Sequence, residues 1–254
     1  MTDFATEAGH WYKADGTPCY TMEGKNGPRP TTLRDARKLI LYPSVTKIIK
    51  EAAAPGLESW KRKNLLLAAM TLPRLPDEDP DNFIKRVAID AEAQASKARD
   101  RGTQIHAEIE TALGGGEISE FALPVLRWLR DQFPDAQWQP ERSFASRLGF
   151  GGKLDAYAPG VVIDFKTSDF AIEDEVGGWD EQLMQLSACS IGLNEDLAKV
   201  QAFNLFVSTR APGIVKPVYW HVDDLRRGWR MFECLLSYWM LRNKYDPHQS
   251  PTCK

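Results

Sequence analysis

The spacing of apolar residues changes near residue 136 and divides the chain into two regions. Before that point, apolar residues recur three and four positions apart among helix-forming residues, which predicts helices. After it, short apolar runs rich in β-branched and aromatic residues predict strands separated by further helices. The predicted strands span 138–147, 152–158, 161–167, 200–208 and 215–222.

Local signals set the expected helix boundaries. Ser44 is the expected N-cap of a helix that Pro55 and Gly56 interrupt. A Pro-rich, acidic loop at 71–81 separates two longer helices, and three glycines at 114–116 end the second. The predicted helices span 57–70, 81–113, 121–133 and 224–245, with another around 179–189.

Two further expectations concern the ends of the chain. Residues 10–22 are expected to form a hairpin, with its turn at 14–17. The last helix has an aromatic stripe that we expect to pack in the core. The stripe consists of Trp229, Phe232, Tyr238 and Trp239.

Opposite charges interrupt the apolar strand at 161–167. Asp164 and Lys166 are two positions apart, so their side chains share a face. A turn at 158–160 would fold Asp155 of the preceding strand beside Asp164. Two carboxylates and a lysine suit a divalent cation with a phosphate group, as phosphodiester hydrolysis requires. A structural Asp164–Lys166 ion pair is the alternative explanation.

The segment 141–168 contains a Glu, then a Gly-Gly-x-x-Asp motif ending at Asp155, then hydrophobic residues leading into Asp164-x-Lys166-Thr-Ser. This order resembles the PD-(D/E)XK nuclease superfamily. The resemblance implies an α/β (α+β) fold with a restriction-endonuclease-like core, in which helices flank a central mixed sheet. The predicted order of a helix, three strands, a helix and further strands agrees with that core.

The resemblance also implies roles for individual residues. Asp155, Asp164 and Lys166 would be catalytic. Both carboxylates and the backbone carbonyl of Phe165 would bind Mg²⁺ or Mn²⁺. Glu141 would have a secondary role at the site, and Thr167 and Ser168 would contact DNA.

One upstream helix resembles the RecB-like branch of the superfamily. Its Gly102-x-x-x-His106 motif precedes the strands, and the resemblance makes His106 a metal ligand. Glu110, one helical turn later on the same face, is a secondary candidate.

The helix around 179–189 resembles the Gln-x-x-x-Tyr helix of the same branch. Gln185 matches the Gln at the mouth of the active site and is a further catalytic candidate, with Gln182 one turn earlier in a secondary role. Cys189 stands where the branch has Tyr, so a Tyr contact with DNA is in doubt while the metal site is unaffected.

The segment 42–49, with 57–61 after it, resembles the N-terminal region of RecB-like phage exonucleases and of the mitochondrial genome maintenance exonuclease, which are metal-dependent DNA exonucleases. The mitochondrial one threads single-stranded DNA beneath a helical arch. Because the net charge is −3, local basic clusters must bind DNA. The expected cluster is Lys61, Arg62 and Lys63, beside Trp60, which either stacks on a base or belongs to the core.

Composition sets the frame for these motifs. With 254 residues and 43% hydrophobic content, the chain can form one sizeable α/β domain. We expect 1–80 to be a hairpin and helical DNA-gripping elaboration, 81–254 to be the nuclease core, and the two to form one compact unit. No apolar run suits a membrane span or signal peptide, so a cytoplasmic location in a bacterial or phage-infected cell is expected.

Cysteine spacing bears on the cofactor. Cys19, Cys189, Cys234 and Cys253 are dispersed without a C-x-x-C pair, which argues against a zinc site or disulfide framework. Some RecB-like nucleases hold an iron-sulfur cluster with a C-terminal Cys trio that this chain lacks. We therefore expect Mg²⁺ or Mn²⁺ and no iron-sulfur cluster.

The sequence thus predicts a metal-dependent DNA exonuclease acting on single-stranded ends in phage-type replication, recombination or end processing, where a protein partner could take part. Three alternatives stay open: a structure-specific or restriction-type endonuclease, a CRISPR-associated end-trimming nuclease, and a catalytically silent DNA-binding module. A covalently closed circular single-stranded substrate would distinguish an endonuclease from an exonuclease. The missing Cys trio disfavours the CRISPR-associated nuclease. The catalytically silent module is disfavoured because Asp155, Asp164 and Lys166 are all present. These motifs encode neither strand polarity nor oligomeric state.

Overall fold

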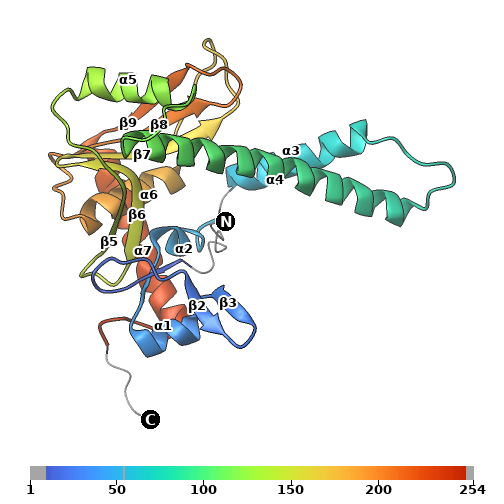
Figure 1. Cartoon of the computed structure of the whole chain (residues 1–254). Coiled ribbons are helices and arrows are strands. Elements are labelled where there is room, and N and C mark those ends of the chain that lie inside the picture. The colour runs from blue at the N-terminus through green and yellow to red at the C-terminus, as the bar shows by residue number, and fades with distance from the viewer. Residues whose placement is uncertain (1–9, 54, 250–254) are drawn as a thin grey trace.

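A mixed five-stranded sheet forms the centre of the protein, and this computed structural model describes residues 10–53 and 55–249 (Figure 1). Its strands are β5 (Gln139–Ala145), β6 (Gly151–Ala158), β7 (Val161–Ser168), β8 (Gln201–Ser208) and β9 (Val215–Trp220), in that spatial order. β7 and β8 are parallel, and the other neighbours are antiparallel. The predicted α/β class with a central mixed sheet flanked by helices is confirmed.

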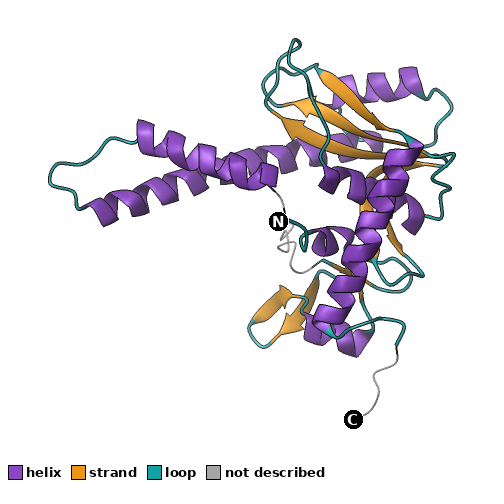
Figure 2. Cartoon of the chain, turned by 180° about the vertical axis from the view of Figure 1, so that it is seen from behind, coloured by secondary structure: helices purple, strands orange, loops and turns teal. Residues whose placement is uncertain are grey.

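Helices cover both faces of this sheet (Figures 1 and 2). One face carries α4 (Pro80–Leu113) and α5 (Ala122–Gln132), and the other carries α6 (Asp180–Gly192) and α7 (Val222–Asn243). Alternation along β7 explains the division, because Ile163 and Phe165 join the core beneath α4 and α5 while Val162 joins the core beneath α6 and α7. Among the described residues, no helix is both long and apolar enough to cross a membrane.

The expected hairpin over 10–22 forms only in part. The turn after Lys13 forms, and it is closed by an antiparallel bridge from Tyr12 to Pro18 and by a hydrogen bond from the Cys19 N–H to the Trp11 carbonyl at 2.7 Å. The longer pairings are others: β1 (Trp11–Tyr12) pairs with β4 (Tyr42–Pro43), and β2 (Thr21–Gly24) pairs with β3 (Gly27–Pro30). Trp11 is buried edge-on against Trp239 of α7, so a distant aromatic contact holds β1 in the core.

Two short helices join these strands. α1 (Leu33–Leu39) was not predicted, although Thr32 and Asp35 form a capping box at its start. α2 (Val45–Ile49) begins at the predicted N-cap, where the Ser44 hydroxyl accepts a hydrogen bond from the Lys47 backbone N–H at 3.1 Å.

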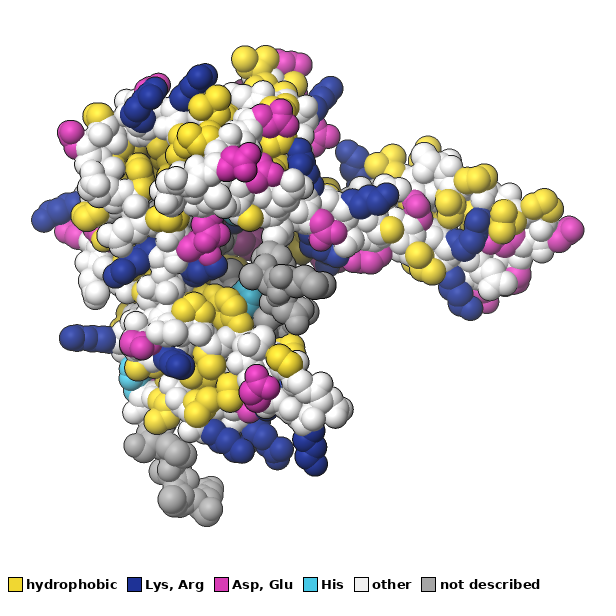
Figure 3. Space-filling view, in the orientation of Figure 1, with side chains coloured by type: hydrophobic (Ala, Val, Ile, Leu, Met, Phe, Trp, Pro, Cys, Tyr) yellow, Lys and Arg dark blue, Asp and Glu magenta, His cyan; other side chains and the backbone are white. Residues whose placement is uncertain are grey.

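A long helical hairpin projects from the body of the protein (Figures 1 and 2). It consists of α3 (Pro55–Thr71) and the first half of α4, which run antiparallel, and we call it the arm. Pro55 begins α3 rather than preceding it, because proline is well tolerated in the first turn of a helix. Figure 3 shows exposed basic, acidic and hydrophobic side chains along the arm. The exposed hydrophobic residues of its outer part are Leu65, Leu66, Leu67, Met70, Leu75, Ile84 and Ile89.

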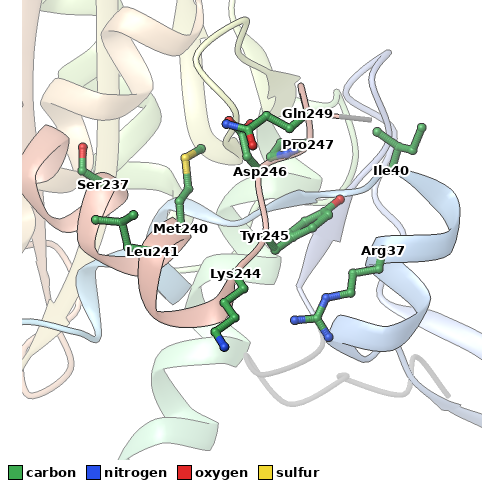
Figure 4. Close-up of a pocket in the computed structure, with 10 residues that line it drawn as sticks. All are labelled: Arg37, Ile40, Ser237, Met240, Leu241, Lys244, Tyr245, Asp246, Pro247 and Gln249. Carbon is green, nitrogen blue, oxygen red and sulfur yellow. The ribbon is translucent and has the colours of Figure 1, made fainter. Parts of the chain in front are cut away.

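The aromatic stripe of α7 is partly in the core. Phe232 and Trp239 are buried as predicted, whereas Tyr238 is 52% exposed. After α7, the Tyr245 hydroxyl lies 2.8 Å from the Leu41 carbonyl and so ties the end of the chain to the residues after α1. A cavity of about 620 Å³ lies at this junction (Figure 4), and Asp246 is the one carboxylate among the described residues that line it.

The crossing of α6 and α7 gives the first prediction. A Cβ atom at Gly228 of α7 would lie 2.6 Å from the Ser187 hydroxyl and 2.7 Å from Leu183 Cγ, so the two helices touch there without room for a side chain. Gly228→Leu should therefore force the helices apart and lower the free energy of unfolding by roughly 1–3 kcal/mol. Thermal denaturation should show a melting temperature lower by about 2–4 °C for each kcal/mol.

Arg226→Leu is the matched control, because it adds the same side chain at an exposed position of α7. An equal melting temperature for the two variants would contradict the close packing of α6 and α7.

Candidate active site

The hairpin of β6 and β7 splits open at two carboxylates. Paired residues run from Ala158 with Val161 to Ala156 with Ile163, so the next pair along this register is Asp155 with Asp164. Backbone pairing stops there. The Phe165 N–H donates instead to Asp155 Oδ2 at 2.7 Å, and the side chain thus takes the place of a backbone acceptor.

Asp164 is 2% exposed, and polar groups from three directions surround its carboxylate. Gln185 Nε2 of α6 donates to Oδ1 at 2.7 Å. Asn204 Nδ2 of β8 donates to Oδ2 at 2.6 Å, and Lys166 Nζ lies 2.8 Å from the same oxygen. Lys166 Nζ also donates to Gln185 Oε1 at 3.3 Å, so Gln185 bridges the two opposite charges. These contacts offset the cost of burying an ionised carboxylate.

Asn204 also belongs to this site, although it was not predicted from the sequence. It is fully buried and pairs directly with Asp164 across the parallel strands, and its Oδ1 accepts a hydrogen bond from Trp220 Nε1 at 2.8 Å. The available signal was one amide side chain within the apolar run of 200–208. A buried polar side chain in such a run requires a hydrogen-bonding partner, which here is the Asp164 carboxylate.

His106 approaches the carboxylates from the opposite face of the sheet. α4 places its Nδ1 3.6 Å from Asp155 Oδ2, and its ring lies edge-on to Phe165 with 6.3 Å between centroids. Burial disfavours the imidazolium, but the Asp155 carboxylate outweighs burial and raises the pKa of His106. His106 is therefore poised beside Asp155, and its role as a metal ligand stays a prediction.

The pKa values of the two carboxylates are shifted in opposite directions. Burial opposes ionisation of Asp155, yet the neighbouring His106 and Lys166 hold its pKa below the ordinary value. Burial raises the pKa of Asp164, and the negative charge of Asp155 adds to that rise against the opposing effect of Lys166. Burial disfavours the Lys166 ammonium, but both carboxylates outweigh it and raise its pKa. Added positive charge at this site would therefore favour the doubly ionised pair.

The chemistry of these groups fits a hard divalent cation. Within the part of the chain that the structure describes, no three His, Cys, Asp or Glu side chains are grouped to hold a metal ion. Mg²⁺ is commonly held by one or two carboxylates, with water and substrate phosphate completing its shell, so a full protein cage is not required. Asp155 and Asp164 supply that number of carboxylates.

The remaining candidates near the sheet have other contacts. Glu141 has φ +52° and forms an ion pair with Lys153, and Gln182 Oε1 accepts a hydrogen bond from the Trp179 N–H at the start of α6. Thr167 faces α4, where its hydroxyl would meet a Cβ at Gly102. Ser168 is exposed at the end of β7.

The candidates on the helices lie in two places. Glu110 is exposed one turn beyond His106 on α4. The basic cluster of Lys61, Arg62 and Lys63 is exposed on α3, where Lys61 pairs with Glu58 at 2.9 Å. Cys189 is buried in α6, where burial and the nearby carboxylates raise the pKa of its thiol, and Cys253 lies outside the described residues.

A cavity of about 730 Å³ adjoins the charged cluster, and this catalytic cavity opens between α2, the start of α3 and α6. Lys166, Gln182 and Gln185 line it on one side, and Thr46 and Lys50 line it on the other. A substrate in this cavity would therefore reach the Lys166 ammonium directly.

No family model matches the chain, and no curated protein matches it in sequence. Among solved structures, a protein from Eubacterium rectale named "Putative exonuclease" is similar at 16% identity and a TM-score of 0.39, over 57% of this chain and 67% of the other. A protein named SSO0001 is similar at 13% identity and a TM-score of 0.33, over 78% of this chain and 89% of the other. The class defined by the fold and the site is thus a mixed α/β protein with two carboxylates and a lysine at a split hairpin.

Asn204 gives the second prediction. Asn204→Ala removes one donor from buried Asp164 and the acceptor of Trp220 Nε1. Because an unpaired buried polar group costs about 1–3 kcal/mol, urea denaturation should show a loss of at least that size. The control is Gln201→Ala at an exposed position of the same strand. Equal stability of the two variants would show that the Asn204 contacts contribute nothing.

Proposed function

We propose that this protein is a metal-dependent deoxyribonuclease that hydrolyses phosphodiester bonds from DNA ends, with single-stranded ends as its substrate. The observation that carries the proposal is the convergence of Asp155, Asp164 and Lys166 at the split hairpin, beside an open cavity. A stability role alone does not call for two carboxylates gathered around an ammonium group that lines a cavity, because a packed apolar group costs less there. We further propose membership of the RecB-like branch of the PD-(D/E)XK superfamily.

Each residue of the cluster has a distinct task in the proposed reaction. Asp155 and Asp164 would hold the cation, together with the Phe165 carbonyl and His106. Mg²⁺ or Mn²⁺, when bound, lowers the pKa of its water and neutralises charge on the phosphate. Lys166 would stabilise the negative charge that develops on the scissile phosphate.

Gln185 controls where Lys166 points. Its amide holds Asp164 Oδ1 through one end and Lys166 Nζ through the other, so the ammonium group has a fixed position before substrate arrives. Such preorganisation is the main way in which an active site stabilises transition-state charge. The imidazole of His106 holds the orientation of Asp155 from the other side.

The setting of the reaction follows from this proposal. An enzyme that acts on free DNA ends would serve replication, recombination or end processing in a bacterial or phage-infected cell, alone or with a protein partner. The arm would guide the strand, because the basic cluster directly follows the residues of α3 that line the cavities.

The direct test uses end-labelled single- and double-stranded oligonucleotides with each end blocked in turn, incubated with Mg²⁺ or Mn²⁺. Asp164→Asn keeps the shape of the side chain but removes its charge, so cleavage should fall on the order of a hundredfold or more. Binding without metal should be unchanged or tighter, because repulsion of phosphate decreases.

Asp131→Asn removes the same charge from an exposed position at the end of α5 and should leave cleavage unchanged. Cleavage by Asp164→Asn within several-fold of the parent protein would refute the assignment. A covalently closed single-stranded circle, which offers no end, should resist cleavage.

The basic cluster gives the fourth prediction. Replacing Lys61, Arg62 and Lys63 together by Ala should weaken DNA binding and lower the slope of log affinity against log salt by about 0.7 for each single-strand phosphate that is no longer neutralised. The drop should correspond to fewer than three phosphates, because Glu58 already pairs with Lys61. Fluorescence anisotropy over a range of salt concentrations measures the slope. Arg127→Ala with Arg130→Ala on α5 is the control, and equal slopes in both variants would contradict DNA binding by the cluster.

A further inference from the structure

A second and larger cavity lies beside the catalytic cavity. Its volume is about 1150 Å³, slightly above the range of roughly 300–1,000 Å³ that small-molecule sites occupy. It lies between the start of α3, the start of α6 and the middle of α7. We call it the aromatic pocket, because two tryptophans, Trp60 and Trp179, line it.

Both tryptophans leave a large surface in contact with water. Trp60 is 43% exposed and Trp179 is 62% exposed, whereas twelve other aromatic side chains among the described residues are buried. The Trp179 ring lies over Gly56, 3.5 Å from where a Cβ would be, so one side of the ring is supported. Two partly exposed rings in one cavity suit a flat aromatic ligand.

The aromatic pocket adjoins the catalytic cavity. The two have part of their walls in common, including Glu181 and Gln182 of α6. Lys166 and Gln185 line the catalytic cavity only. A ligand group in the aromatic pocket can therefore be joined covalently to a phosphate group beside Lys166.

The charge of the pocket wall selects which part of a nucleotide enters. Asp180 and Glu181 line the pocket, and Asp180 is paired with Arg227 of α7 at 2.9 Å. These carboxylates repel phosphate but can accept hydrogen bonds from the amino groups of bases. Met184 and Met231 add polarizable sulfur that packs well against aromatic rings. A neutral, planar, nitrogen-containing ring fits this wall, and a phosphate does not.

A chain of contacts connects the pocket to the catalytic carboxylate. Asn204 contacts Asp164 at one end and Trp220 Nε1 at the other. The Trp220 ring in turn leaves no room for a side chain at Gly178, since a Cβ there would lie 2.2 Å from the ring. Gly178 directly precedes Trp179, so the same packing that holds Asp164 also fixes the backbone beside the pocket.

From these observations we propose that the aromatic pocket binds one unpaired nucleobase of the substrate strand, at a fixed distance from the phosphate that is cleaved. This inference rests on the proposed function and adds a reason for the choice of single strands. A base stacked between Trp60 and Trp179 cannot be paired with a complementary strand. The substrate must therefore be single-stranded, or frayed, at that nucleotide.

The test measures binding in EDTA, where no cleavage occurs. Short labelled single strands of equal length each carry one abasic site, placed at successive positions. For the parent protein, an abasic site at one of these positions should weaken binding by roughly 5- to 150-fold. This fold-change is equivalent to the 1–3 kcal/mol found for stacking one base. Trp179→Ala and Trp60→Ala should weaken binding of the intact strand and remove this position dependence, whereas Trp179→Phe should keep most of it.

Tyr219→Ala is the matched control, because it removes a similarly exposed aromatic ring from the opposite face of the sheet, beside Phe203. An abasic effect of equal size in the parent protein and in Trp179→Ala would overturn the pocket assignment, as would the lack of any sensitive position. Because binding needs no cleavage, a protein that binds bases in this way but cleaves no DNA would refute the nuclease proposal alone. A protein that cleaves DNA and is indifferent to every abasic site would refute the pocket alone.

Discussion

Burial of the Asp164 carboxylate is the constraint on which the site depends. A carboxylate with 2% exposure is stable only if donors surround it, and they come from β7 itself, from β8 and from α6. The Asp164–Lys166 ion pair alone would need only one strand. The additional donors, Gln185 and Asn204, fix the positions of a helix and a neighbouring strand around one pair of oxygens.

The split of the β6–β7 hairpin follows from the same constraint. If the backbone pairing continued past Ala156 and Ile163, it would press two carboxylates together with no room for a counter-charge. The Asp155 side chain instead accepts the Phe165 N–H, which satisfies the backbone donor and keeps the strands apart. His106 and Lys166 then approach from opposite faces of the sheet, so an imidazole and an ammonium group flank the gap.

The sequence predicted the parts of this arrangement that local rules control. The two-residue period of a strand places Asp164 and Lys166 on one face, and a tight turn brings Asp155 opposite Asp164. Contacts between distant segments escaped prediction. β1 pairs with β4, and Trp11 packs against Trp239 of α7; neither the strand partner nor the register is encoded near Trp11. Asn204 was visible as a polar residue in an apolar strand, but its partner depended on β7 and β8 being adjacent and parallel.

The chemistry of the exposed side chains changes along α3 of the arm. Near the body, α3 presents Leu57 and Trp60 to the cavities and then exposes the basic cluster of 61–63. Farther out, its exposed side chains are mainly hydrophobic, as at Leu66 and Met70. The basic cluster thus lies on the inner part of α3, next to the residues of that helix that line the cavities. The charge of the whole chain is therefore a poor guide to its local electrostatics, because a net charge of −3 includes a basic segment beside the cavities.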